Sequence, residues 1–369
     1  MKIAHVTSAH PRNDIRIFHK MCLSLANSNY DITLFVADGL GDDNVQGVKI
    51  FDVGRPANRL TRFVFTPFKL SEIVKRSNYD IIQLHDPDLL LVAKTLNNRK
   101  QLVFDSHESV GEQILTKHYI PKLIRKLVSK LYMSFETKVC RDLGAIICAT
   151  DTISEQFVDR ANFVTTIANY PILGEFSGTQ YHTSKKKIVY AGVISEERGI
   201  LVLLDALTLC EIPVKLVLMG RFANKKIERE VRAHKTFVEN VEYLGQVERS
   251  ELAKNYSEAT CGIVTFQPGP NHTNSMPNKL FEYMSASLPV VASNLPLWSK
   301  IVNQNACGIC VDPTDPVAIA RGIDEIVNNP QKATQMGSNG LQSVLREYNW
   351  NTEFDKLLIT YERISQRRT

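Results

Sequence analysis

A segment in the second half of the chain, NSMPNKLFEYMSASLPVVAS at 274–293, carries groups that could bind a phosphorylated ligand. A loop that ends at Pro277 is expected to lead into a helix, whose first backbone N–H groups are unpaired and lie at the positive end of the helix dipole. Lys279 adds a positive charge, and Glu282, one turn later, could accept hydrogen bonds from two hydroxyls of a ribose. The alternative is an ordinary loop–helix–strand unit in which Glu282 is solvated.

The segment HVTSAHPRNDIRIFHK at 5–20 places charged side chains where a strand leads into a helix. Glycine is the usual residue at such a turn when a phosphate approaches the backbone, and this segment has none. His10 and Arg12 could instead contact a diphosphate or an acceptor with their side chains. Asp14 could do the same or cap the first helix, and Arg16 could have a structural role.

Two further pairs of residues could do chemistry, and each has a structural alternative. Asp86 and Asp88, spaced as Asp-Pro-Asp, could hold a divalent cation, but we favour capping of a helix at Pro87 or contact with an acceptor. His107 and Glu108 could act as general acid and base, and Asp105 and Glu108 could equally be loop caps. We favour His107 as a substrate contact.

The composition indicates a globular protein with more than one core. The chain has 369 residues, of which 44% are hydrophobic and 22% charged, so two domains are expected. The seven cysteines are scattered and predict reduced core thiols, and the pair Cys307 and Cys310 fits a buried strand better than a redox or zinc site. No apolar run is long enough to span a membrane, and polar residues from Ser8 onward interrupt any signal segment. We therefore expect a cytoplasmic protein.

Positive charge is concentrated in two segments of the first half. Residues 117–141 carry seven Lys or Arg against one acid, and residues 54–78 carry six against one. Within the first of these, Leu123, Leu127, Leu131 and Phe135 recur every four residues, which predicts an amphipathic helix. This helix could contact anionic lipid, or pack on its own sheet with its lysines solvated. No aromatic-basic interleaving indicates nucleic acid.

Strand and helix patterns alternate twice along the chain. In the first half strands are predicted at 2–6, 32–36, 48–53, 81–84, 101–105 and 145–149, with helices such as 14–27 and 87–96 between them. A polar run at 174–187 is the best linker candidate. In the second half strands are predicted at 187–191, 214–219, 241–243, 261–265, 290–292 and 308–311. This α/β pattern predicts two doubly wound sheets, with a site at the carboxyl ends of their strands.

These segments, taken in order, resemble a known enzyme family. PNKLFEYMSASLPVVAS is similar to the nucleotide-sugar segment of retaining glycosyltransferases with the GT-B fold, family 4, and AHPRNDIRIFHK resembles a bacterial surface-polysaccharide branch of that family. LHDPDLL, VFDSHE, NYP, YAGVISEERGI, LMGRF, YLGQV and the terminal YNWNTEFDKLLITYERI also match, and the resemblance covers nearly the whole chain. It implies two Rossmann-like domains facing across a cleft, with a C-terminal helix that returns to the first domain.

The resemblance also implies a donor site. Arg198 matches a cation on the diphosphate and Glu282 the ribose-binding carboxylate, and we expect Lys279 to help stabilise the leaving diphosphate. The remaining donor-site residues on this basis are Gly192, Arg221, Gln246, Val247, Asn274, Ser275, Met276, Pro277 and Asn278. Two positions depart from the family pattern. Val193 replaces a second arginine, whose charge Arg221, Lys279 or Arg12 could supply, and Asn274 replaces a carboxylate, which puts the contact with the donor sugar in question.

On the acceptor side, His107 matches a histidine that faces the transferred sugar, so it joins Arg198 and Lys279 as a catalytic candidate. His10, Arg12, Asp86, Asp88 and Glu108 are expected to line the acceptor site or the cleft. The implied reaction retains the anomeric configuration, because the acceptor attacks from the face that the diphosphate leaves. It needs no metal, no cofactor and no protein nucleophile.

The predicted domains are 1–172, with a C-terminal helix at about 350–369, for the acceptor, and 173–349 for the nucleotide sugar. The predicted function is transfer of a sugar from a UDP- or GDP-sugar to a glycan, such as an undecaprenyl-diphosphate-linked acceptor, in bacterial surface polysaccharide synthesis (O-antigen, capsule or exopolysaccharide). The protein would be cytoplasmic, and could attach peripherally to an anionic membrane surface. The alternatives are a nucleotide-sugar epimerase or hydrolase of the same fold, or a catalytically weak partner protein that binds nucleotide sugars.

Overall fold

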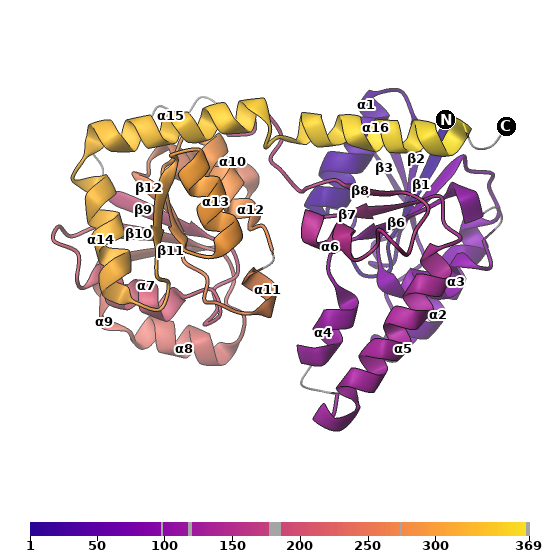
Figure 1. Ribbon diagram of the computed structural model, residues 1–369, viewed down its shortest axis with the longest axis horizontal. Coiled ribbons are helices and arrows are strands. Elements are labelled where there is room, and N and C mark those ends of the chain that lie inside the picture. Colours follow the sequence, from indigo (N-terminus) through magenta and orange to yellow (C-terminus); the bar gives the residue numbers. More distant parts are fainter. Residues whose placement is uncertain (97–98, 117–119, 177–185, 274, 367–369) are drawn as a thin grey trace. The chain divides into compact units, whose positions relative to one another are not determined.

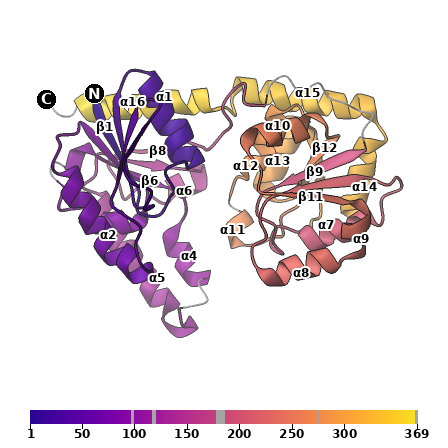
Figure 2. The same ribbon diagram turned by 180° about the vertical axis from the view of Figure 1, so that it is seen from behind.

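The computed structural model in Figure 1 describes residues 1–369 except 97–98, 117–119, 177–185, 274 and 367–369. The chain divides into two compact units: an N-terminal unit of Met1–Asn169 with Thr352–Thr369, and a C-terminal unit of Tyr170–Asn351. Figure 2 shows the same two units from behind. Most of the predicted linker at 174–187 lies outside the described residues. The predicted division into two α/β units is confirmed.

The N-terminal unit is built on an eight-stranded sheet with the order β3-β4-β2-β1-β5-β6-β7-β8. Every pairing is parallel except that of β3 with β4, which is antiparallel. The strands are β1 (Lys2–Val6), β2 (Asp31–Val36), β3 (Asp43–Val45), β4 (Val48–Asp52), β5 (Ile81–Leu84), β6 (Leu102–Ser106), β7 (Ala145–Cys148) and β8 (Val164–Thr166). The central strands are buried on both faces, as their continuous apolar sequences predict.

Two of these strands were not predicted. β3 has the sequence DNV and is mostly exposed, so it carries no apolar signal. It forms because Gln46 and Gly47 both adopt positive φ angles, 51° and 84°, which turn the chain back onto β4. β8 is three residues long and only partly buried. Both strands lie at sheet edges, where burial and therefore sequence signal are weakest.

Helical segments cover both faces of this sheet. They are η1 (Ile15–Cys22), α1 (Leu23–Asn27), α2 (Arg59–Val74), η2 (Pro87–Leu89), α3 (Leu90–Ala93), η3 (Arg99–Gln101), α4 (Val110–Thr116), α5 (Lys122–Cys140), α6 (Asp151–Glu155) and α16 (Trp350–Gln366). The first of them, η1, is a π-helix. Asp14 caps it, because its side chain accepts hydrogen bonds from the backbone N–H groups of Arg16 and Ile17 at 2.9 Å.

The C-terminal unit has a six-stranded parallel sheet with the order β11-β10-β9-β12-β13-β14. Its strands are β9 (Lys187–Ala191), β10 (Lys215–Met219), β11 (Val241–Gly245), β12 (Cys261–Val264), β13 (Val290–Ser293) and β14 (Gly308–Val311). Its helices are α7 (Ile200–Leu207), α8 (Lys225–Ala233), α9 (Lys235–Asn240), α10 (Arg249–Ser257), α11 (Pro270–Thr273), α12 (Asn278–Ser285), α13 (Pro296–Gln304), α14 (Pro316–Val327) and α15 (Pro330–Arg346). All six strands match predicted ones.

In each sheet the chain first adds strands on one side of its first strand and then adds the later strands on the other side, so the strand order reverses at one point. In the N-terminal unit it lies between β1 and β5, and in the C-terminal unit between β9 and β12. Loops that follow the two flanking strands separate there, which leaves room for a ligand at the carboxyl edge. The residues after β1 and β5, and after β9 and β12, are therefore the positions at which a site is expected.

Two predictions about surface and core can be compared directly with the structure. Leu123, Leu127 and Leu131 of α5 are 97%, 58% and 62% exposed, so the packing alternative is wrong for these three residues. It holds at Phe135, which packs against the core of the N-terminal unit. Cys307 is buried, as expected of a strand residue, and burial raises the pKa of its thiol to about 12. No helix among the described residues is both long and apolar enough to cross a bilayer.

Candidate functional site

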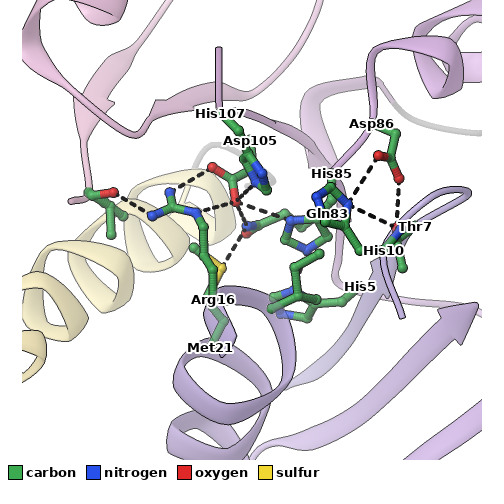
Figure 3. Close-up of polar contacts among 12 residues, drawn as sticks. His5, Thr7, His10, Arg16, Met21, Gln83, His85, Asp86, Asp105 and His107 are labelled. Carbon is green, nitrogen blue, oxygen red and sulfur yellow. Dashed lines mark hydrogen bonds and ion pairs between the residues drawn. The ribbon is translucent and has the colours of Figure 1, made fainter. Parts of the chain in front are cut away.

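Polar side chains at the carboxyl ends of β1 and β5 lie together where the strand order of the first sheet reverses (Figure 3). Thr7 Oγ1 donates a hydrogen bond of 2.6 Å to Asp86 Oδ2, and the Ser8 backbone N–H donates one of 2.8 Å to the same oxygen. Ser8 Oγ donates to Asp88 Oδ2 at 2.7 Å. The two carboxylates predicted at this edge are thus tied to the loop after β1, and each is nearly buried.

Asp86 is held as a carboxylate. Burial by itself would raise its pKa, but hydrogen bonds from His10, Thr7 and Ser8 outweigh that penalty and hold the pKa well below its ordinary value. His10 Nδ1 lies 3.1 Å from Asp86 Oδ1. Since Asp86 is only 3% exposed, it supports the loop and His10 rather than presenting a free surface to a ligand.

Asp88 has the opposite character. It is 5% exposed, and its Oδ1 atom has no hydrogen-bond partner among the described residues. Burial, with the neighbouring charge of Asp86, raises the pKa of Asp88 to about 6. The two aspartates of the Asp-Pro-Asp sequence therefore differ in protonation behaviour although they are two residues apart.

The raised pKa of Asp88 leads to a prediction about stability. A carboxyl group whose pKa is about 6 in the folded chain and about 3.9 when unfolded destabilises the fold progressively as pH rises through this interval. We expect Asp88→Asn to stabilise the N-terminal unit by about 2–3 kcal/mol at pH 8 and to have little effect near pH 4. Thermal unfolding of both proteins at the two pH values measures this. An equal shift at both would contradict the assignment.

Asp105, at the end of β6, is the centre of the buried cluster. Arg16 of η1 binds it through two hydrogen bonds, from Nη2 to Oδ1 at 2.7 Å and from Nε to Oδ2 at 3.1 Å. Arg16 also donates from Nη1 to the carbonyl oxygen of Ile167 at 2.8 Å. Burial would raise the pKa of Asp105, but the charge of Arg16 and hydrogen bonds from His107 and His85 place it well below its ordinary value.

A row of imidazole rings leads from Asp105 into the core. His85 Nδ1 lies 3.1 Å from Asp105 Oδ2, and His85 Nε2 lies 2.9 Å from His5 Nδ1. Burial lowers the pKa of His5 and of His85, so both rings are neutral at pH 7. Because the ionised Asp105 can only accept, His85 must donate through Nδ1 and accept through Nε2, which fixes His5 as the next donor. Tyr361 of α16 donates to Gln83 at 2.5 Å and lies 3.4 Å from His5 Nε2.

His107 contacts Asp105 on the side nearer to solvent. Its Nε2 atom lies 3.0 Å from Asp105 Oδ2, and 22% of its side chain is exposed. The ring of His10 lies 5.1 Å from that of His107, with 30% of the His10 side chain exposed. The structure thus brings together two of the predicted site residues, His10 and His107, at one edge of the sheet.

Two other predicted residues of this unit lie apart from the cluster. Arg12 donates to both oxygens of Asp38 at 2.8 Å and to the Gly41 carbonyl oxygen at 2.7 Å, so its guanidinium is already paired. Glu108 is exposed and accepts a hydrogen bond from Gln113. Among the described residues, neither side chain forms a hydrogen bond or ion pair with His10 or His107.

The atoms of His85, Asp105 and His107 lie within 4.8 Å of one another, as metal ligands could. The surrounding charges argue against a cation there. The Arg16 guanidinium already neutralises Asp105, and a divalent ion beside it would be repelled. The ring nitrogens of both histidines that face Asp105 donate protons to it, so these nitrogens cannot also ligate an ion shared with that carboxylate. Asp86 and Asp88 are not part of this group among the described residues.

In the C-terminal unit, Arg198 lies at the corresponding point between β9 and β12. Its guanidinium stacks on the ring of Phe266, which follows β12, at 5.0 Å. Gly192, directly after β9, has a φ angle of 142°, and a Cβ atom there would lie 2.9 Å from Arg198 Nη1. Glycine at this position therefore lets the arginine lie against the backbone. Arg198 makes no ion pair among the described parts of the chain.

Glu282 on α12 lies in a buried ionic network. Lys279 Nζ donates to it at 2.5 Å, Arg249 Nη1 at 3.2 Å and Tyr256 Oη at 3.3 Å. Burial would raise the pKa of Glu282, but the charges of Lys279 and Arg249 outweigh it and lower the pKa. Arg249 also pairs with Glu175. The solvated alternative for Glu282 is therefore wrong, and Lys279 is not a free cation in this structure.

The remaining predicted donor residues lie on loops at the carboxyl edge of this sheet. Arg221 follows β10, and Gln246 and Val247 follow β11; Arg221 and Gln246 are exposed. Pro277 stands at the N-cap of α12 without a side-chain hydrogen bond, so Asn278 begins a helix whose first N–H groups are not capped by that residue. Ser275 accepts a hydrogen bond from the Trp298 indole at 2.7 Å, and Met276 packs on the core. Asn274 lies outside the described residues.

Sequence reasoning missed several members of both clusters. They are Thr7, Ser8, His5, Gln83 and His85 in the N-terminal unit, and Glu175, Arg249 and Tyr256 in the C-terminal unit. His5 and Gln83 had a signal, because each interrupts an otherwise apolar buried strand. Arg249, 33 residues before Glu282, had none.

Comparison with known proteins identifies the type of protein. The family described as "Glycosyltransferase Family 4" matches residues 16–169, and "Glycosyl transferases group 1" matches residues 176–343. The chain carries the two domains of a GT-B glycosyltransferase. The predicted recognition is confirmed at this level. A phosphatidyl-myo-inositol mannosyltransferase from Mycobacterium leprae is 26% identical over 56% of this chain, and the chain spans about half, 52%, of that relative's length.

Solved GT-B structures match over almost the whole chain. A sucrose-phosphate synthase from Thermosynechococcus elongatus has a TM-score of 0.74 at 19% identity, covering 98% of each chain. The Anabaena protein HepE, solved in complex with UDP and glucose, has a TM-score of 0.73 at 15% identity, covering 98% of this chain and 99% of its own. At such identities the likeness shows the GT-B fold and goes no further.

Proposed function

We propose that this chain is a retaining glycosyltransferase that moves a sugar from a UDP- or GDP-sugar to a glycan acceptor. The observation that carries the proposal is the position of Arg198 at the carboxyl edge of the second sheet, against Gly192 and without an ion pair among the described residues. The carboxyl edge of a doubly wound sheet, where a cation and the N-terminus of a helix are present, suits a diphosphate. HepE, solved with UDP and glucose, offers a precedent in the same fold.

The proposed chemistry places the residues as follows. Arg198 stabilises the departing nucleoside diphosphate, and Lys279, released from or shared with Glu282, adds a second charge. The acceptor attacks on the face that the diphosphate leaves, and a diphosphate oxygen takes its proton, so no protein nucleophile is needed. The donor residues after β9, β10 and β11, with Ser275, Met276 and Asn278, surround the nucleotide sugar. No cofactor enters, and we expect equal rates in EDTA and in magnesium.

Two measurements test this function. A thermal-shift screen against UDP, GDP and their sugars should reveal one selective ligand, which stabilises the protein by mass action. With that donor, NMR of the product should show an α-linkage formed from an α-donor. A β product would contradict retention. Hydrolysis or epimerisation of the donor without transfer would favour an enzyme of another class. Nucleotide binding without any turnover would favour a partner protein.

We further propose that the acceptor is linked to a lipid, such as an undecaprenyl diphosphate, in bacterial surface polysaccharide synthesis. The support is a surface formed by α2 and α5, which lie side by side in Figures 1 and 2. On α2 the residues Leu60, Phe63, Val64, Phe65 and Phe68 are exposed, and on α5 Leu123, Ile124, Leu127 and Leu131. Exposed Lys122, Lys126 and Lys130 lie beside them. Apolar side chains interleaved with lysines suit an anionic membrane surface.

This surface leads to a prediction about membrane binding. We expect Leu127→Gln with Leu131→Gln to reduce sedimentation with anionic liposomes by at least tenfold, because each buried leucine contributes about 1.5–3 kcal/mol. Val238→Gln, at an 80% exposed position on α9, is the matched control and should bind as before. Equal pelleting with neutral and anionic liposomes, or none at all, would contradict the electrostatic part of the proposal.

A further inference from the structure

The two partly exposed histidines at the edge of the first sheet are each backed by a buried aspartate. His10 lies 3.1 Å from Asp86, and His107 lies 3.0 Å from Asp105 (Figure 3). Asp86 and Asp105 are 3% and 0% exposed, so a bound sugar can reach the histidines more readily than the carboxylates behind them. The two rings are 5.1 Å apart, close enough for one ligand group to contact both.

The two aspartates differ in what else they bind. Asp105 forms a two-bond ion pair with Arg16, so its charge is already compensated. Asp86 accepts only from the Thr7 hydroxyl, backbone N–H groups and His10, and it has no Lys or Arg partner among the described residues. A carboxylate without a cationic partner favours a charged imidazole beside it, whereas a compensated one favours hydrogen bonding to a neutral imidazole.

The other charged groups around His10 act in the same direction. Asp14, ahead of η1, and Asp105, from β6, both favour its protonated form, and the other titratable groups near it are the rings of His85 and His107. Burial by itself lowers the pKa of His10, but the hydrogen bond and charge of Asp86 outweigh it, so the pKa lies above its ordinary value.

We propose that Asp86 and Asp105 are positioning residues that orient His10 as a hydrogen-bond donor and His107 as a hydrogen-bond acceptor, a matched pair for one sugar hydroxyl. With Nε2–H of His107 directed at Asp105, its Nδ1 atom keeps the lone pair, and it contacts no other described residue. With Nδ1–H of His10 directed at Asp86, its Nε2–H is the outward donor. A hydroxyl both donates and accepts, so it satisfies the two rings together. This inference rests on the proposed transfer reaction only for the identity of the ligand.

The test begins with the protonation states themselves. Long-range proton–nitrogen spectra of the full chain, labelled with nitrogen-15 histidine, report each ring, and His10→Gln and His107→Gln assign the two signals. At pH 7 we expect His10 to carry protons on both nitrogens, and His107 to carry its proton on Nε2 and a lone pair on Nδ1. A His107 proton on Nδ1, a charged His107 or a neutral His10 would overturn the proposal. This readout needs no activity, so it holds even if the proposed function fails.

Variants then connect the two states to turnover. Asp86→Asn should make His10 neutral, and Asp105→Asn should remove the Nε2–H preference of His107, each with a fall in kcat of about tenfold or more and unchanged nucleotide affinity. The control is Glu136→Gln, because Glu136 is a 5% exposed acid on α5 outside the cluster. It should change neither the histidine spectra nor kcat. If Asp105→Asn does not fold, the spectra of the unaltered chain and of Asp86→Asn are sufficient to test the proposal. An Asp86→Asn protein with a charged His10 would overturn the proposal.

Discussion

Arg198→Ala is expected to lower kcat by about a hundredfold to a thousandfold, with a much smaller change in donor affinity. The reason is that an electrostatic contact with a leaving group acts mainly on the transition state, and loss of one such donor typically costs about 10²–10³ in rate. The guanidinium is available for this role because it makes no ion pair among the described residues, and Phe266 and Gly192 hold it in place. Initial rates against donor concentration separate kcat from KM.

Two companion variants sharpen the interpretation. Arg229→Ala removes an exposed arginine of α8 that, among the described residues, hydrogen-bonds only to the Lys225 carbonyl oxygen of its own helix, and it should leave the rate unchanged. Arg198→Lys keeps the charge but not the planar fork, so it should recover part of the loss. If Arg198→Ala raised KM alone and left kcat intact, the residue would bind ground and transition states equally, and its proposed role would be wrong.

Arg16→Met is expected to cost the N-terminal unit about 3–5 kcal/mol of stability. This substitution leaves Asp105 buried and ionised without its cation, which is the most costly way to break an ion pair. Asp105 also has hydrogen-bond contacts with His85, His107 and Gln83, but these cannot replace the full positive charge of the guanidinium. For a unit of this size the loss corresponds to a fall of roughly 6–20 °C in the first melting transition, which circular dichroism or calorimetry measures.

The chain offers a matched control for this prediction. Arg99 and Asp142 form an ion pair of the same residue types at 2.6 Å, but their side chains are 42% and 46% exposed, against 6% and 0% for Arg16 and Asp105. Arg99→Met should therefore cost about 0–1 kcal/mol. Similar losses for the two variants would mean that burial does not determine the strength of the pair.

The fold could be predicted from the sequence because its central strands are apolar on both faces. A continuous run such as AIIC at β7 is buried wherever it lies in a parallel sheet, so its sequence carries the information. β3 and β8 could not be found this way, since edge strands are held by turns and backbone hydrogen bonds that leave no apolar pattern.

The candidate sites were predictable only in part. Residues on one loop or one helix turn, such as Lys279 and Glu282 three positions apart, can be paired from spacing alone. Pairs such as Arg16 with Asp105, 89 residues apart, depend on which strands become neighbours, and no local pattern reports that. Protonation was also beyond the sequence, because Asp86 and Asp88 differ through burial and partners, not through residue type.

The contact of Tyr361 with Gln83 and His5 has a consequence for biosynthesis. A ribosome completes residues 1–169 long before residue 361 emerges, and at about 5–20 residues per second the delay is roughly 10–40 s. During that interval the buried amide and imidazole of β5 and β1 lack the phenol that α16 supplies, as the backbone N–H of Ala168 lacks Glu353. The nascent N-terminal unit should therefore remain incompletely folded, and a client for chaperones, until translation of α16 is finished.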